Sequence, residues 1–235
     1  MRAILLIAVN FVREQRWPIF VLLLWVLLLA FLGLTPNIQR QREDLLFIFK
    51  QVAVYVVVFS VFFGGSAIHN ERKSRRILAV LSKAVGRQQY LSGLVLGVTI
   101  ACSIYCFALG ITGSWTLGEA GFSVRQIWFL MLYLVAASML AGTVALMFST
   151  FLNPFFAAGA SAVFLGLPLV AVHLGAASAS VSPLYSLGKA VFDSSFKSSG
   201  GLLWFPLGLA VVETIVFWVL AARIFSRMDI AVSVE

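Results

Sequence analysis

Six long apolar blocks, separated by short polar segments, make up most of the chain. Each block is long enough to cross a bilayer as a helix, because about 20 apolar residues span the hydrocarbon core at 1.5 Å per residue. Strand-like alternation of apolar and polar residues is absent, and helices satisfy every backbone amide in lipid. The expected spans cover residues 17–34, 51–68, 90–113, 127–152, 154–174 and 202–222. The pattern therefore predicts an all-α membrane protein in which residues 1–235 form a single transmembrane domain.

The segment before the first block has a different pattern. Its apolar residues recur at helical spacing, and they are Ile4, Leu5, Ala8, Phe11 and Val12. Arg13 and Arg16 follow, and no small-residue cleavage site of a signal peptide comes after them. This pattern predicts a helix over residues 1–16 that lies in the membrane interface, with Trp17 marking the entry into the bilayer.

Composition and charge narrow the function classes. Of the 235 residues, 61% are hydrophobic and only 11% are charged, which excludes a disordered chain and a nucleic-acid-binding domain. The net charge is +8, and eleven of the 17 Lys and Arg residues lie in segments on the side shared by both termini. By the positive-inside rule we expect both termini in the cytoplasm.

The segment 70–87, between the second and third expected spans, combines basic and apolar residues. Four apolar residues fall on one helical face, and these are Ile77, Leu78, Leu81 and Val85. Basic residues cluster on roughly the opposite face, namely Arg72, Arg76, Lys83 and Arg87. An amphipathic helix at the cytoplasmic surface is expected. Two interpretations remain open for it: contact with anionic lipid, or docking into a groove of a partner protein.

The same segment resembles the cytoplasmic coupling segment of type-2 ABC transporter permeases. The family pattern has a Glu at the end of the second span, then an apolar start, a Leu-Ser pair and a Val-x-Arg end. The matching residues here are Glu71, Ile77, Leu78, Leu81, Ser82, Val85 and Arg87. Arg75 and Arg76 stand where the family commonly has Gly-Thr, and Ala84 replaces a Pro. The six spans and the N-terminal interfacial helix are also similar to this family over the whole chain.

The resemblance implies a permease subunit rather than an enzyme. It implies a second permease chain and two copies of a separate ABC ATPase subunit, which would bind ATP and Mg²⁺. In this family the coupling segment docks into a groove of the ATPase, with Ile77, Leu78 and Leu81 as the buried contact and Glu71 and Arg87 at its ends. Arg72 and Val85 would belong to the same coupling segment. The resemblance also implies export and a place in the plasma membrane (the bacterial inner membrane), and the apolar composition suggests a hydrophobic or amphipathic substrate.

The chain itself carries no nucleotide-binding motif of the form Gly-x4-Gly-Lys-Ser/Thr, so no catalytic residue, cofactor or nucleic-acid partner is expected in it. Membrane lipids are the remaining expected contact. The alternative function is a membrane scaffold or assembly factor whose basic segment 70–87 docks a protein other than an ATPase, or anionic lipid.

Three further features are candidate sites. Glu213 is the only acid inside an expected span, where it marks a polar pocket, a permeation route or a structural hydrogen bond. Gly93 and Gly97 form a GxxxG pattern, which indicates close helix packing within the chain or at a dimer face. Cys102 and Cys106 lie one turn apart, but sulfur side chains are also ordinary apolar filler, and no metal site is expected.

Overall fold

The part of the chain that can be described is helical. The computed structural model describes residues 2–34, 42–73, 86–119, 121–175, 182, 185 and 204–227, and within them the chain forms helices and no strand. The helices are α1 (Arg2–Glu14), α2 (Arg16–Leu34), α3 (Arg42–Lys73), α5 (Arg87–Glu119), α6 (Val124–Ser149), α7 (Pro154–His173) and α9 (Phe205–Arg227). The all-α class predicted from the sequence is confirmed.

Five of these helices, α3, α5, α6, α7 and α9, are each long and apolar enough to cross a membrane. α1 and α2 add a sixth crossing if the two together are one bent span, and their axes differ by 64° at the break. Long apolar helices in this number indicate a multi-pass membrane protein.

The helices are longer than several of the apolar blocks. α3 begins at Arg42 rather than at residue 51, and α5 continues to Glu119 rather than ending at 113. The polar residues at the end of α5 are compatible with the helix because their hydroxyls bond to carbonyls one turn back. Ser114 donates to Gly110 O at 2.7 Å, and Thr116 donates to Thr112 O at 3.0 Å.

Short turns precede α6 and α7, and a glycine ends α7. Gly121, with φ 79°, forms the turn before α6, in the left-handed region that favours glycine. Asn153 is the N-cap of α7, and Pro154 follows at the first helical position, where its missing N–H costs nothing. α7 ends at Gly175, which has φ 90° and donates to Val172 O at 3.0 Å.

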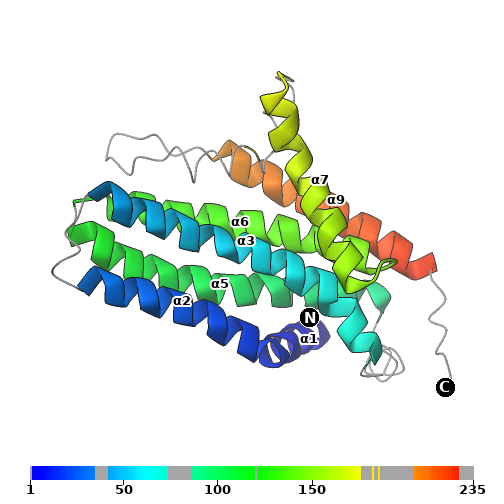
Figure 1. Cartoon of the computed structure of the whole chain (residues 1–235). Coiled ribbons are helices and arrows are strands. Elements are labelled where there is room, and N and C mark those ends of the chain that lie inside the picture. The colour runs from blue at the N-terminus through cyan, green and yellow to red at the C-terminus, as the bar shows by residue number, and fades with distance from the viewer. Residues whose placement is uncertain are drawn as a thin grey trace.

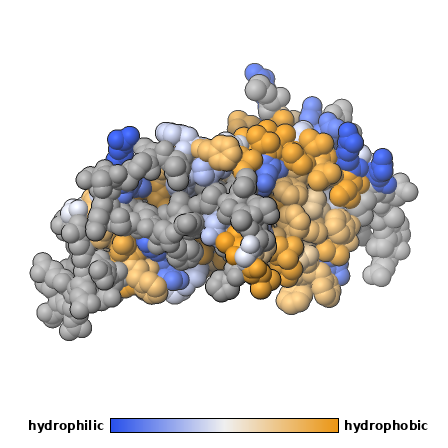
Figure 2. All heavy atoms as spheres, turned by 90° about the horizontal axis from the view of Figure 1, so that it is seen from above, coloured by the Kyte–Doolittle hydropathy of each residue, from blue (hydrophilic) through white to orange (hydrophobic). Residues whose placement is uncertain are grey.

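The long helices α2, α3, α5 and α6 run side by side, whereas α7 leaves the bundle at a steep angle (Figure 1). α6 is the central helix: 78% of its most apolar window is buried, against 12% for α7. The outer faces of α7 and α9 are correspondingly apolar and exposed, and Figure 2 shows a broad hydrophobic area on the face seen from above. In a bilayer such a surface faces lipid or another protein.

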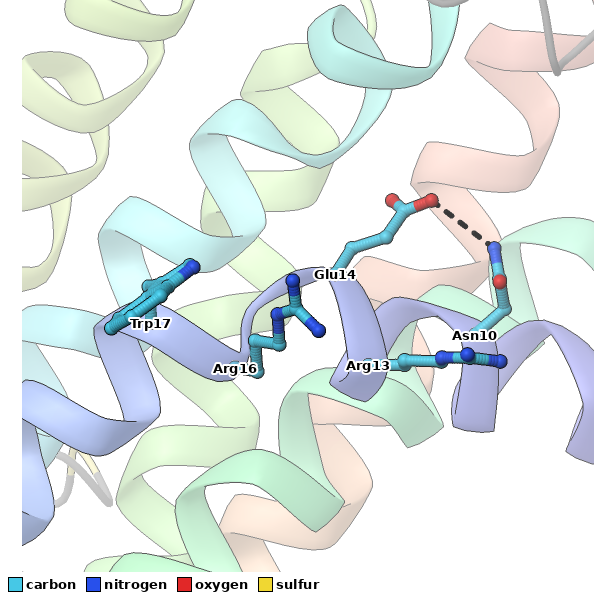
Figure 3. A pocket seen from close by; sticks show the side chains of 5 residues that line it. All are labelled: Asn10, Arg13, Glu14, Arg16 and Trp17. Atoms are coloured by element: carbon cyan, nitrogen blue, oxygen red, sulfur yellow. Dashed lines mark hydrogen bonds between the residues drawn. The ribbon is translucent and has the colours of Figure 1, made fainter.

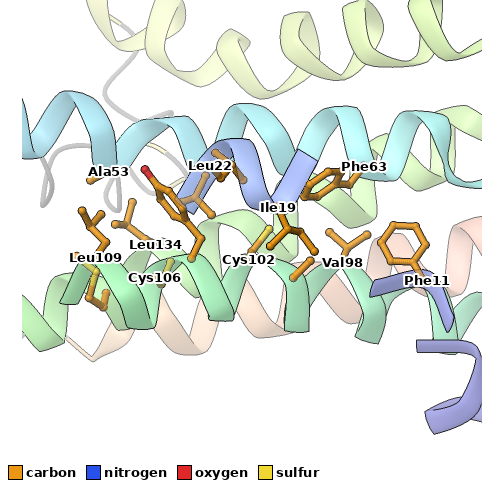
Figure 4. Packing of buried hydrophobic residues seen from close by; sticks show 14 of the residues in the cluster. Phe11, Ile19, Leu22, Ala53, Phe63, Val98, Cys102, Cys106, Leu109 and Leu134 are labelled. Carbon is orange, nitrogen blue, oxygen red and sulfur yellow. The ribbon is translucent and has the colours of Figure 1, made fainter. Parts of the chain in front are cut away.

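The main core lies between α2, α3, α5 and α6. Figure 4 shows Leu22 of α2, Ala53 of α3, Cys102 and Cys106 of α5 and Leu134 of α6 packed together. Tyr105 is fully buried in this core, and its hydroxyl donates to the Val52 carbonyl of α3 at 2.5 Å. The core therefore joins α3 and α5 by a hydrogen bond as well as by apolar contact.

A second contact brings α3, α5 and α6 together even more closely. A Cβ on Gly64 of α3 would overlap the Gly142 carbonyl of α6. A Cβ on Gly142 would lie 2.7 Å from Val98 Cγ1 of α5 and 3.4 Å from Ser60 O of α3. Glycine is therefore required at both positions for the backbones to approach to this distance.

Candidate functional site

Glu213 lies in a groove between α7 and α9. The groove has a volume of about 420 Å³, within the range of small-molecule sites, and α6 contributes to its wall through Leu140. Its nine lining residues are Leu140, Phe164, Leu165, Leu167, Pro168, Ser182, Glu213, Val216 and Phe217. Seven of these nine described residues are apolar, and Glu213 carries the one carboxylate among them.

The carboxylate of Glu213 has no hydrogen bond or ion pair with any residue that the structure describes. Within the described helices, Glu213 is also the only acidic residue of the five candidate membrane spans, which cover residues 45–69, 87–118, 124–149, 154–172 and 205–227. Its neighbour Thr214 is buried and uses its hydroxyl within α9, donating to Ala210 O at 2.7 Å. The structural hydrogen bond considered from the sequence, to a Ser or Thr of another helix, is therefore not found in the described residues.

The opposite wall of the groove contains a proline inside a helix. Pro168 has no N–H, so the carbonyl of Phe164 one turn earlier lacks its usual intrahelical donor. Both residues line the groove. The two walls thus contribute a carboxylate on α9 and, on α7, a residue whose carbonyl is deprived of its helical donor, and no basic residue is among the lining residues that the structure describes.

Arg87, in the first turn of α5, forms hydrogen bonds with the last turn of α9. Its Nη1 donates to Phe225 O at 3.0 Å and to Ser226 O at 2.9 Å. The guanidinium also lies 5.9 Å from the centre of the Phe225 ring, and Tyr90 stacks on that ring at 6.2 Å. A cation at the C-terminal end of a helix is favourable because the last carbonyls are unpaired and carry partial negative charge.

The other residues of the expected coupling segment are only partly located. Ile77, Leu78, Leu81 and Val85 lie outside the described residues. Asn70 to Lys73, which we expected to begin the segment, instead form the last turn of α3, so Glu71 and Arg72 are in that helix. The end of α3 and the start of α5 therefore bound a shorter connection, residues 74–86.

Gly93 and Gly97 lie where α5 crosses α1. A Cβ on Gly93 would come within 2.7 Å of Ile7, and a Cβ on Gly97 within 2.8 Å of Phe11. The structure thus places the GxxxG pattern at a contact within the chain. Because α1 packs on the first turns of α5, it lies at the same end of the bundle as Arg87.

The joint between α1 and α2 forms a polar cleft that the sequence did not predict as a site. Its lining residues are Asn10, Arg13, Glu14, Arg16 and Trp17, and Asn10 donates to Glu14 at 3.2 Å (Figure 3). All five side chains are exposed. The signal for this cleft in the sequence is the Arg-Glu-Gln-Arg-Trp run, which we interpreted only as an anchor at the membrane surface.

Cys102 and Cys106 are buried within the core and unpaired. Among the described residues, no group of three or more His, Cys, Asp or Glu side chains is placed so that it could hold a metal ion. The two cysteines contribute apolar packing in α5.

Comparisons with known proteins do not identify a family for this chain. No protein-family model matches the sequence, and no curated protein matches it.

Proposed function

We propose that the chain is the transmembrane subunit of an ATP-binding-cassette transporter of the type-2 permease kind. In this proposal α2, α3, α5, α6, α7 and α9 are the six crossings, and α1 lies in the cytoplasmic interface. The bend of 64° between α1 and α2 supports separate roles for these two helices, because a helix in the interface plane must turn sharply to enter the bilayer.

The observation that carries this proposal is the position of the basic segment. It connects two long helices, α3 and α5, at the end of the bundle where α1 and the last turn of α9 also lie. This end carries Arg13, Arg16, Arg87, Arg223 and Arg227, which agrees with a cytoplasmic side. The residues that resemble the coupling segment of the family lie in or beside this connection.

Arg87 provides a physical route by which a partner could act on the bundle. It sits at the end of the basic segment and holds the last carbonyls of α9. If a partner moves the segment, the two hydrogen bonds transmit that displacement to α9, the helix that carries Glu213. In this account the partner is a pair of ABC ATPase subunits, which bind ATP and Mg²⁺ and change the access of the spans.

The remaining parts of the proposal follow from the resemblance. A second permease chain would complete the complex, the membrane would be the bacterial inner membrane with both termini cytoplasmic, and the complex would export a hydrophobic or amphipathic molecule. The exposed apolar faces of α7 and α9 leave ample surface for lipid and for a second chain.

Copurification tests the proposal. The tagged chain is isolated from its native membrane in a mild detergent, and the polypeptides that accompany it are identified by mass spectrometry. We expect an ABC ATPase with the wild-type chain and its loss with Leu81→Asp. Val124→Asp is the matched control, because Val124 is exposed at the start of α6, away from the basic segment, and should leave the complex intact.

A wild-type chain that carries no ATPase, or a Leu81→Asp chain that keeps it, would contradict the docking role. Copurification of a protein other than an ATPase, bound through the basic segment, would instead favour the scaffold or assembly function. Retention of anionic lipid alone would favour the lipid-contact interpretation of residues 70–87.

A further inference from the structure

The groove at Glu213 has features that select for a particular kind of ligand. Among the described residues that line it, leucine, valine, phenylalanine and proline side chains form the walls together with Ser182, and the Glu213 carboxylate is the one charged group. Such a site offers apolar contact on most sides of a ligand and one fixed point of negative charge.

The depth of Glu213 argues against a role at the membrane surface. It is eight residues after the start of α9, which places it about 12 Å along the helix from Phe205. A glutamate side chain is too short to reach the interface from that depth. Acidic residues at such positions are therefore placed next to a partner cation or a polar ligand.

The described surroundings contain no such cation. The lining residues include no Lys, Arg or His, and Glu213 forms no ion pair with any residue in the described ranges. The Phe164 carbonyl, which lacks its usual donor because of Pro168, adds a second acceptor to the lining residues. The carboxylate favours a positive charge in the groove and disfavours an anion.

We propose that the groove between α7 and α9 binds a hydrophobic molecule with one positive charge, and that Glu213 pairs with that charge. The apolar body of the ligand lies against Phe164, Leu167 and Phe217, while the cationic group lies next to the carboxylate. That the ligand is the exported substrate rests on the proposed transport function, whereas its binding to this groove does not.

The volume of the groove fits a compact amphiphile better than a large one. At about 420 Å³ it suits a drug-sized ligand and is too small for a folded peptide or an extended glycan. Phe164, Leu167 and Val216 line the groove and are 40%, 55% and 50% exposed, so in this proposal an amphiphile reaches the site from the bilayer.

Tetraphenylphosphonium and neutral triphenylphosphine oxide are suitable probes, because both present phenyl groups and only the first is charged. Their binding to the full chain, purified in an uncharged maltoside detergent, is measured by equilibrium dialysis with radiolabelled probe. We expect the wild-type chain to prefer the cation by about tenfold or more, since an ion pair in an apolar groove is only weakly screened.

Two substitutions test whether Glu213 causes the preference for the cation. Glu213→Gln keeps the size of the side chain and should reduce cation binding by about tenfold while changing neutral-probe binding less than twofold. Glu213→Asp keeps the charge and should retain most of the cation preference. Glu14→Gln is the matched control, because it removes an exposed carboxylate on α1 that does not line the groove, and it should change the binding of neither probe.

Equal wild-type affinity for the two probes would overturn the proposal without any variant. A cation preference that survives Glu213→Gln would place the site elsewhere. A cation preference that disappears when phosphatidylethanolamine is added would identify the ammonium group of this zwitterionic lipid as the occupant and would overturn the assignment to a ligand with one positive charge. A chain that binds the cation but carries no ATPase would leave this site in place and contradict the transporter.

Discussion

The two hydrogen bonds from Arg87 to the end of α9 allow a prediction of their contribution to stability. Arg87→Ala removes both bonds, at 3.0 and 2.9 Å, and the contact with the Phe225 ring. Hydrogen bonds from a charged group contribute about 1.5–3 kcal/mol each. Because one nitrogen makes both bonds at a half-buried site, we expect a loss of about 2–4 kcal/mol in the free energy of unfolding.

The assay is unfolding of the purified chain in mixed micelles, with increasing denaturing detergent and helix content as the signal. Arg87→Lys should lose about half as much stability as Arg87→Ala, because an ammonium keeps the charge but not the planar donor geometry. Arg223→Ala is the control: this arginine is exposed one turn earlier on α9 and makes no side-chain hydrogen bond within the described residues. Equal stability of Arg87→Ala and Arg223→Ala would refute the role of Arg87 as the link between α5 and α9.

Three further predictions test the packing of the bundle. Gly64→Ala should lower the free energy of unfolding by about 1–3 kcal/mol, because the added Cβ would meet the Gly142 backbone. Gly208→Ala is the control, since open space surrounds Gly208, and it should not destabilise the chain. Equal stability of the two variants would contradict the contact between Gly64 and Gly142. Tyr105→Phe removes the buried bond to α3 and should cost about 0.6–1.7 kcal/mol in the same unfolding assay, so an unchanged midpoint would argue against that bond. Cys102 and Cys106 are 0% and 1% exposed and should react with a maleimide only after unfolding, and rapid labelling of the folded chain would disprove their burial.

Hydrophobic patterning located the helices well because each block is bounded by charged or turn residues. It placed α6 within three residues at both ends, since Asn153 and Pro154 terminate one block and begin the next. It failed at the ends of α3 and α5, where the helix continues past the apolar run. At the end of α5 the hydroxyls of Ser114 and Thr116 bond within the helix, a compensation that average hydrophobicity does not detect.

The tertiary contacts of the candidate residues could not be read from local spacing. Arg87 finds its acceptors on α9, 138 and 139 positions along the chain, so no helical periodicity links them. The sequence singled out Gly93 and Gly97 but left their partner open between another copy and this chain, and the structure places Ile7 and Phe11 of α1 against them. Gly64 was not singled out, although its pairing with Gly65 inside an apolar block is a signal of close packing.

Glu213 shows what the sequence could predict about a candidate site and what only the structure could add. Its presence inside an apolar block was sufficient to make it a candidate site, because a carboxylate within a membrane span is energetically costly unless it has a polar partner. The sequence could not say what surrounds it, since the groove is formed by α7, α9 and a residue of α6 that are distant in the chain. The departure of α7 from the bundle, which opens this groove, depends on packing over the whole molecule (Figure 1).

Site-specific photo-crosslinking at position 81 tests the central claim most directly. A photoreactive amino acid replaces Leu81 in the full chain, intact cells are irradiated, and the crosslinked product is identified by mass spectrometry. The transporter account predicts a crosslink to an ABC ATPase subunit that carries its own nucleotide-binding motif, formed from the cytoplasmic side. A crosslink to lipid alone, to a different protein, or to a component outside the cell would contradict it.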